Sequence, residues 1–117
     1  NKAKVQSASY TQKQQEELLS DTWNKIESDV LSILNEFKEI SDTYKLYDES
    51  IIDEYEQMLS SAYSAYETGN ISFLDLLDSV RLGVKVKLEF ESIKAKQNIL
   101  IAKLYQTTGK INPIQEN

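Results

Sequence analysis

The side chains of this sequence best placed for chemistry are two carboxylates, Asp75 and Asp78. They lie three residues apart at the expected start of a helix, so they share one face and favour the positive end of the helix dipole. The chain has no Cys and no His, which excludes thiol nucleophiles, imidazole bases and the commonest zinc ligands. Nothing indicates the cleft that paired carboxylates need for hydrolysis. We therefore expect no enzyme, no cofactor and no metal site, with Met58 as core filler rather than a soft-metal ligand.

The two carboxylates have two interpretations. Asp75 stands three residues after Ser72, the spacing of a capping box, so helix capping and dipole chemistry account for it. Asp78 lies a turn too deep to cap a helix, so capping accounts for it less well than for Asp75.

The element that must position these residues is a turn between two helices. Gly69 is placed to end an incoming helix, because a left-handed residue just past a helix C-terminus carries no Cβ penalty when it is Gly. Ser72 and Asp75 predict a capping box for the outgoing helix. Ile71 and Leu76 sit where a hydrophobic staple fixes the exit angle. These signals agree on one hairpin turn.

The first helix is expected over about 10–67, with residues 1–9 either loop or frayed helix. Its apolar residues mostly alternate steps of four and three, the seam of a coiled coil, and two consecutive steps of four form a stutter. Around Ser50 two interpretations stand: solvated helix-face residues, or a kink at a second capping-box match between Ser50 and Asp53. The seam residues are Trp23, Ile26, Val30, Ile33, Phe37, Ile40, Tyr44, Tyr47, Ile51, Tyr55, Met58, Ala62 and Tyr66.

The second helix is expected over about 72–108, followed by a tail at 109–117 in which Gly109 and then Pro113 supply stop signals. Gly83 lies inside it at a cost of about 1 kcal/mol relative to Ala, which indicates a close helix–helix approach. Two apolar stripes run along this helix. One is Leu77, Val84, Leu88, Ala95, Ile99 and Ala102, and the other is Val86, Phe90, Ile93, Leu100 and Leu104.

Folding at the turn brings basic residues of the second helix toward acidic residues of the first, and we expect cross-helix ion pairs there, each contributing less than about 1 kcal/mol. The residues concerned are Lys85 and Lys87, and Asp53, Glu54 and Glu56. Two apolar surfaces remain uncovered. One is whichever of the two stripes of the second helix does not face the first helix, and the other is formed by Leu18, Leu19 and Trp23 of the first helix. A lone hairpin cannot bury both, so other helices are expected to pack on them.

Composition bounds the class of protein. The 117 residues, 40% of them hydrophobic, make one domain or a piece of one. The longest apolar run, at 99–102, is far below the roughly 18 residues of a membrane span. The net charge of −6 argues against a nucleic-acid partner. No signal peptide is visible, and a start without Met is expected of a fragment of something longer.

The residues around the turn resemble a known family. The pattern runs from Tyr66 and Gly69 through Ser72, Asp75, Leu77 and Asp78 to Arg81, and the helix ends in Leu104, Tyr105 and Gly109. It resembles the C-terminal repeat of TolC-like outer-membrane efflux proteins, and the amino-acid sequence at 69–78 is most similar to the heavy-metal-exporter branch of that family. The resemblance is strongest over about 60–109.

The resemblance implies an all-α fold, a long antiparallel hairpin that forms part of a trimeric α-helical tunnel in the periplasm of a Gram-negative bacterium. Membrane contact would come only through β-barrel strands outside this segment. The turn would dock the hairpin of a periplasmic adaptor protein through Tyr66, Thr68, Gly69, Asn70, Ile71 and Ser72. Asp75 and Asp78 match an acidic pair at the tunnel entrance, and Tyr66 matches a tyrosine that helps to hold the tip closed. At Ile71 some members carry an arginine that makes a closing ionic link.

Two hypotheses for the function follow. The first is a tunnel segment of an efflux channel, which conducts substrates passively and docks an adaptor. The second is a generic structural hairpin, such as a coiled-coil spacer or a module that dimerises into a helical bundle.

Overall fold

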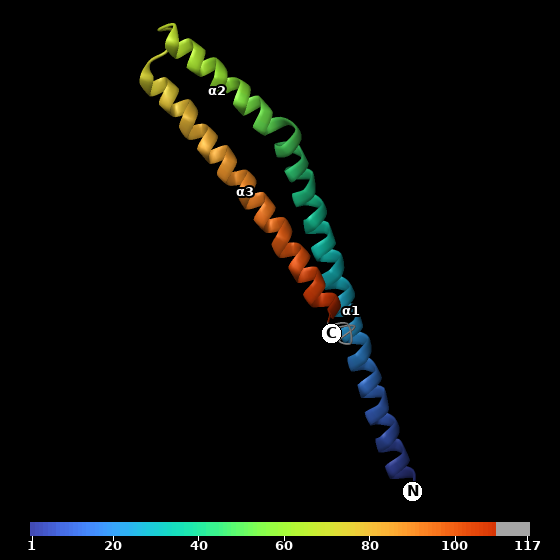
Figure 1. Cartoon of the computed structure of the whole chain (residues 1–117). Coiled ribbons are helices and arrows are strands. Elements are labelled where there is room, and N and C mark those ends of the chain that lie inside the picture. Colours follow the sequence, from blue (N-terminus) through green and yellow to red (C-terminus); the bar gives the residue numbers. More distant parts are fainter. Residues whose placement is uncertain (110–117) are drawn as a thin grey trace. The chain divides into compact units, whose positions relative to one another are not determined.

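The computed structural model describes residues 1–109, and these are all-α (Figure 1). The elements are α1 (Lys2–Leu46), a π-helical turn η1 (Tyr47–Ile51), α2 (Ile52–Glu67) and α3 (Phe73–Gly109). Pro113 and the rest of the expected tail lie outside the described residues. The described residues divide into two compact units, one of Glu36–Ala102 and one of Asn1–Asn35 with residues 103–109.

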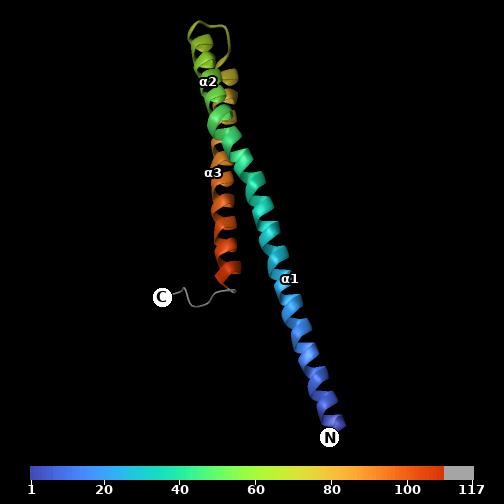
Figure 2. The same cartoon turned by 90° about the vertical axis from the view of Figure 1, so that its right-hand side faces the viewer.

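The unit Glu36–Ala102 is an antiparallel helical hairpin, as the sequence predicts. Gln97 donates to Ser41 at 3.3 Å, Tyr47 to the Glu89 carboxylate at 2.8 Å, and the Tyr55 phenol to the Ser79 carbonyl at 3.0 Å. We call the part of this unit from 36 to 67 the first arm of the hairpin and its part of α3 the second arm. As the residue number on the first arm rises from 41 to 55, the number of the bonded residue on the second arm falls from 97 to 79. Figure 2 shows the chain reversing between α2 and α3.

The first helix differs from the expected single α-helix in two ways. It begins at Lys2, so residues 2–9 are helical rather than loop. It also contains η1, where the backbone N–H of Ile52 donates to the carbonyl of Tyr47, one residue further back than in an α-helix. No side-chain cap forms at the residue before η1 or at the residue before α2, so the expected capping box from Ser50 to Asp53 does not form, whereas the alternative of a kink near Ser50 is confirmed. Figure 1 shows the helix direction changing at this turn.

The buried face of the first arm of the hairpin follows the predicted seam as far as Tyr55 and then departs from it. Met58 and Tyr66 are 40% and 41% exposed, whereas Leu59 is half-buried. Their assignment to the seam is therefore wrong, and Leu59 takes the place of Met58. The helical face continues in a step of four from Tyr55, since α2 resumes regular α geometry directly after the π turn.

Only one of the two apolar stripes of α3 faces the first arm of the hairpin. Within the hairpin unit, Leu100 of one stripe is 2% exposed, and Val86, Phe90 and Ile93 are half-buried. Phe90 stacks on Tyr44 with ring centroids 5.2 Å apart. We call the other stripe the outward stripe of α3 (Leu77, Val84, Leu88, Ala95, Ile99 and Ala102). Of these, only Leu77 is partly covered.

Gly83 marks the close helix–helix approach that the sequence predicts. Gly83 is buried, and a Cβ atom built on it would overlap the phenol of Tyr55, which is itself 6% exposed. The ring lies in the space that any side chain at position 83 would take, and its hydroxyl reaches the Ser79 carbonyl one turn away. The tyrosine therefore locks α2 to α3 through both packing and a hydrogen bond.

The other unit leaves apolar side chains exposed, as expected. Leu18, Leu19 and Trp23 are 66%, 63% and 54% exposed. A shallow open groove lies between α1 and the last turns of α3, lined by Asp29, Ser32, Ile33, Lys103, Gln106 and Thr107. Within residues 1–109, no helix is both long and apolar enough to cross a lipid bilayer.

The expected cross-helix ion pairs do not form. Lys85 and Lys87 make no ion pair with the carboxylates at 53, 54 and 56, and the ion pairs among residues 1–109 run along α3, from Arg81 to Asp78 and from Lys94 to Glu91. All five side chains concerned are exposed. An exposed pair gains too little to hold two long side chains in one geometry, so the charges stay on the outer surface of the hairpin.

Candidate functional site: the hairpin turn

Gly69 ends α2 in a Schellman motif. Its φ of +78° is the only positive φ among residues 1–109. The N–H of Gly69 donates to the carbonyl of Tyr66 at 3.0 Å, and that of Asn70 to the carbonyl of Ala65 at 2.8 Å. This pair of bonds is the signature of the motif. A Cβ at Gly69 would meet nothing within 4 Å, so glycine is required here by the backbone and not by crowding.

Polar side chains complete the end of α2. The hydroxyl of Thr68 donates to the carbonyls of Ser64 and Ala65, both at 3.1 Å, and the amide of Asn70 donates to the Thr68 hydroxyl at 3.0 Å. The same two carbonyls also accept the backbone N–H groups of Thr68 and Asn70, so the Thr68 hydroxyl adds a second donor to each of them at the end of the helix. Thr68 and Asn70 of the predicted docking tip therefore shape the turn, while both remain exposed.

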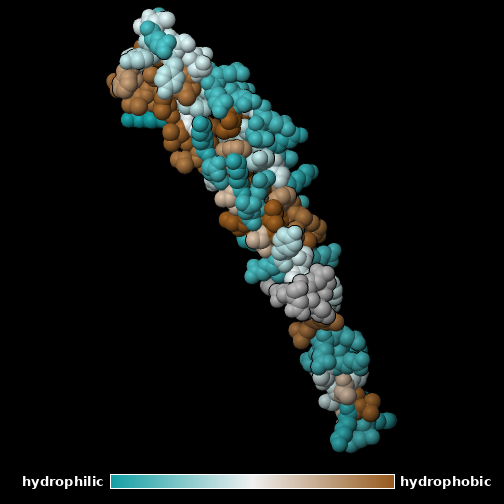
Figure 3. Space-filling view, viewed as in Figure 1, coloured by the Kyte–Doolittle hydropathy of each residue, from teal (hydrophilic) through white to brown (hydrophobic). Residues whose placement is uncertain are grey.

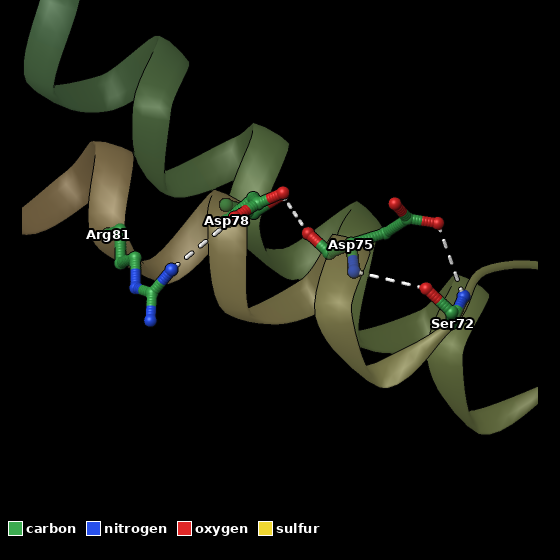
Figure 4. Close-up of polar contacts among 5 residues, drawn as sticks. Ser72, Asp75, Asp78 and Arg81 are labelled. Carbon is green, nitrogen blue, oxygen red and sulfur yellow. Dashed lines mark hydrogen bonds and ion pairs between the residues drawn. The ribbon is translucent and has the colours of Figure 1, made fainter.

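The predicted capping box begins α3 (Figure 4). The backbone N–H of Asp75 donates to Ser72 Oγ at 3.1 Å, and the N–H of Ser72 donates to Asp75 Oδ2 at 3.3 Å. Ile71 is half-buried and Leu76 is 6% exposed, as expected for the two positions of a hydrophobic staple. The turn is thus fixed on both sides by local bonds, and its exit angle is set within seven residues.

The acidic pair is divided between two tasks. The carboxylate of Asp75 is held by the capping box, whereas the carboxylate of Asp78 reaches Arg81 Nη1 at 3.8 Å. The Asp78 and Arg81 side chains are 74% and 71% exposed, so this ion pair is weak and open to water. Asp78 is therefore the freer carboxylate of the two, while its role at an entrance stays a prediction.

Tyr66 has an aromatic partner that sequence reasoning missed. Its ring lies 6.1 Å from the ring of Phe73, tilted by 60°. The two residues flank the turn, one in the last turn of α2 and one at the first position of α3. Two aromatic residues, one three residues before the glycine and one four residues after it, are the signal that would have found this contact. The pair forms an exposed apolar rim at the turn, with Tyr66 41% and Phe73 59% exposed.

No cluster of side chains suited to holding a metal ion is found among residues 1–109. They contain no group of three or more His, Cys, Asp or Glu side chains that could hold a metal ion. Outside the turn, Tyr47 and Glu89 form a cross-helix pair in which hydrogen bonding to the carboxylate raises the pKa of the phenol. This contact joins the two arms of the hairpin.

The site is thus an exposed turn whose backbone is held by local hydrogen bonds on both sides. No protein-family model, no curated protein and no solved structure matches this chain.

Proposed function

We propose that this chain is a periplasmic tunnel segment of a TolC-like outer-membrane efflux channel, with its hairpin turn docking an adaptor protein. The observation that carries the proposal is the outward stripe of α3. A helix in a tunnel wall needs neighbours on two sides, and α3 has one apolar stripe packed in the hairpin and one exposed, with Leu88 66% exposed. The proposed channel is a homotrimer in which further helices cover this stripe.

The turn supports the docking part of the proposal. Its backbone is preorganised by the Schellman motif and the capping box, so a partner would bind it without paying to order a loop. Gly69 has open space around it, which lets the backbone of a partner hairpin come close. The exposed rim of Tyr66 and Phe73 would supply apolar contact, and Thr68 and Asn70 would supply polar contact at the centre.

The proposed mechanism is passive conduction with a gate at the turn. Small rotations of the hairpin would open or close the tunnel tip, and adaptor binding would shift the balance between these states. Three copies of Asp75 and Asp78 around an opening would favour cations. Since Arg81 accompanies Asp78 in each copy, the ring would be less negative than its carboxylates alone suggest. No thiolate or imidazole is available for a metal ion in transit.

The proposal is tested by photocrosslinking in the cell that produces the protein. A photoreactive amino acid at Asn70, on the turn, is compared with one at Ser61, which is exposed on α2 away from the turn. We expect position 70 to crosslink to a periplasmic protein with a helical hairpin, and position 61 not to do so. Gly69→Trp should abolish the crosslink while helicity, measured by circular dichroism, is retained. Crosslinking that Gly69→Trp leaves unchanged, or a cytosolic product, would overturn the docking role.

The alternative function, a structural hairpin that dimerises into a bundle, is favoured by the same outward stripe, because a second helical hairpin would cover it equally well. The two proposals differ in the coding sequence around this segment. A channel requires flanking strands of alternating apolar and polar residues and an upstream repeat with its own hairpin turn. A dimerising module requires neither.

A further inference from the structure

The two arms of the hairpin differ in charge. Residues 36–67 contain nine carboxylates and two lysines, whereas 73–102 contain five basic residues and four carboxylates, of which two, Asp75 and Asp78, lie in its first two turns. All of the carboxylates in 36–67 are exposed. The ion pairs among the described residues stay within α3. The charges of the two arms therefore do not neutralise each other inside the hairpin.

The basic charge of α3 lies beside its outward stripe. Arg81 and Lys85 are four residues apart and precede Leu88 by seven and three residues, so the three side chains share one helical face. Each of them is exposed, Leu88 by 66%. Val84 and Ile99 of the same stripe are each 55% exposed. The outer surface of α3 is thus an apolar stripe bordered mainly by basic residues, with Asp78 paired to Arg81 at the start of the border.

The outer surface of α2 is complementary to it. Asp53, Glu56, Tyr63 and Glu67 follow one another at helical spacing, in steps of three, seven and four, and all are exposed. Tyr63 is 48% exposed and provides an apolar centre among carboxylates. In Figure 3, hydrophobic surface gathers where α3 lies and hydrophilic surface covers α2.

We infer that the outward stripe of α3 binds the acidic outer face of α2 in a second copy of this chain. The contact joins two different surfaces, so it is heterologous and builds a ring or a chain of copies rather than a two-fold dimer. Apolar burial supplies the affinity, and the opposite charges select this face and speed the encounter. The inference uses the same outward stripe as the proposed channel function, and it goes further by naming the acidic face of α2 in a second copy as the surface that covers this stripe.

The test uses the 117-residue chain in sedimentation velocity with paired charge reversals. Variant A is Arg81→Glu with Lys85→Glu, and variant B is Asp53→Lys with Glu56→Lys. We expect each variant alone to associate about tenfold or more weakly than the original chain, because like charges then face each other. An equimolar mixture of A and B should recover the original association, since every contact between A and B joins opposite charges. The control Lys2→Glu with Lys4→Glu, which changes net charge as much as variant A, should leave association unchanged.

The outcomes separate the alternatives. A chain that stays monomeric at every concentration overturns the inference, as does a mixture of A and B that stays dissociated while both variants remain helical by circular dichroism. Unchanged association of variant B would show a two-fold contact between α3 helices instead. Binding of the original chain to vesicles of anionic lipid with no self-association would assign the basic face to a membrane surface. The crosslinking test at position 70 reads a different surface, so either proposal can fail without the other.

Discussion

Tyr55 and Gly83 show how a residue that weakens a helix can strengthen a fold. Gly83 costs the isolated helix about 1 kcal/mol relative to alanine. In the hairpin its missing side chain leaves room for the phenol of Tyr55, which is buried and bonded to the Ser79 carbonyl at 3.0 Å. Burying an aromatic ring of this size contributes more than the glycine costs.

The first prediction concerns this contact. Gly83→Ala should destabilise the hairpin by about 1–3 kcal/mol, the usual cost of overpacking, because the new methyl group overlaps the Tyr55 ring. Urea unfolding followed by circular dichroism measures the change. The matched control is Gly109→Ala, where a Cβ would meet nothing within 4 Å, and it should be neutral or slightly stabilising. A Gly83→Ala variant as stable as Gly109→Ala would show that the two helices do not approach here.

The second prediction concerns pH. Because the bond to Glu89 raises the pKa of Tyr47, the folded hairpin keeps this proton at a pH where the unfolded chain, with an ordinary phenol, has lost it. The contribution is therefore full below about pH 10 and is lost as the pH rises through the pKa of the folded state. Urea unfolding at stepwise increasing pH should show stability falling above about pH 10, and Tyr47→Phe should reduce that fall. Tyr63→Phe, which removes a hydroxyl with no hydrogen bond to another described residue, should leave it unchanged.

At the scale of elements, the turn was predictable and the π-helical turn was not. The turn depends on residues within ten positions of each other, and Gly69, Ser72 and Asp75 each have one dominant local role. In η1 no residue type requires a π turn, and the sequence signal was only a seam that stepped by four twice. Cross-helix contacts were the least predictable: Leu59 replaced Met58 because the helical phase after η1 decides which side chain faces inward.

The third prediction follows from the extra residue in η1. Deleting Glu49, which is exposed within the π turn, should let α1 and α2 join as one α-helix while both keep their buried faces. Deleting Glu39, equally exposed but inside α1, should rotate the following residues by about 100° and turn Tyr44 away from Phe90. Thermal unfolding should show a small change for the first deletion and a large loss for the second. Equal losses for the two deletions would mean that η1 is needed for its shape and not merely tolerated.

At the scale of the whole molecule, the sequence predicted an all-α hairpin with apolar surface left over, and the fold agrees. The two stripes of α3 could be found because their spacing is helical. Which of them faces inward depends on the contacts of Gly83 and Phe90 with Tyr55 and Tyr44 on the first arm of the hairpin. The channel function, the adaptor and the trimer stay predictions, since they concern surfaces that other chains or segments would cover. The difference in charge between the two arms was not recognised from the sequence. Cross-helix ion pairs were expected instead.

The last prediction links this uncovered surface to stability. If copies of the chain associate only when folded, association stabilises the fold by mass action, and the melting temperature must rise with protein concentration. At a concentration about a hundredfold above the dissociation constant, the gain approaches about 2.7 kcal/mol, which amounts to several degrees for a chain of this size. Leu88→Gln should make the melting temperature independent of concentration, because it places an amide in the outward stripe. Leu18→Gln is the matched control, since both leucines are 66% exposed and position 18 lies in the other unit. Loss of the concentration dependence in both variants would mean that any exposed leucine drives association, and the surface on α3 would have no special role.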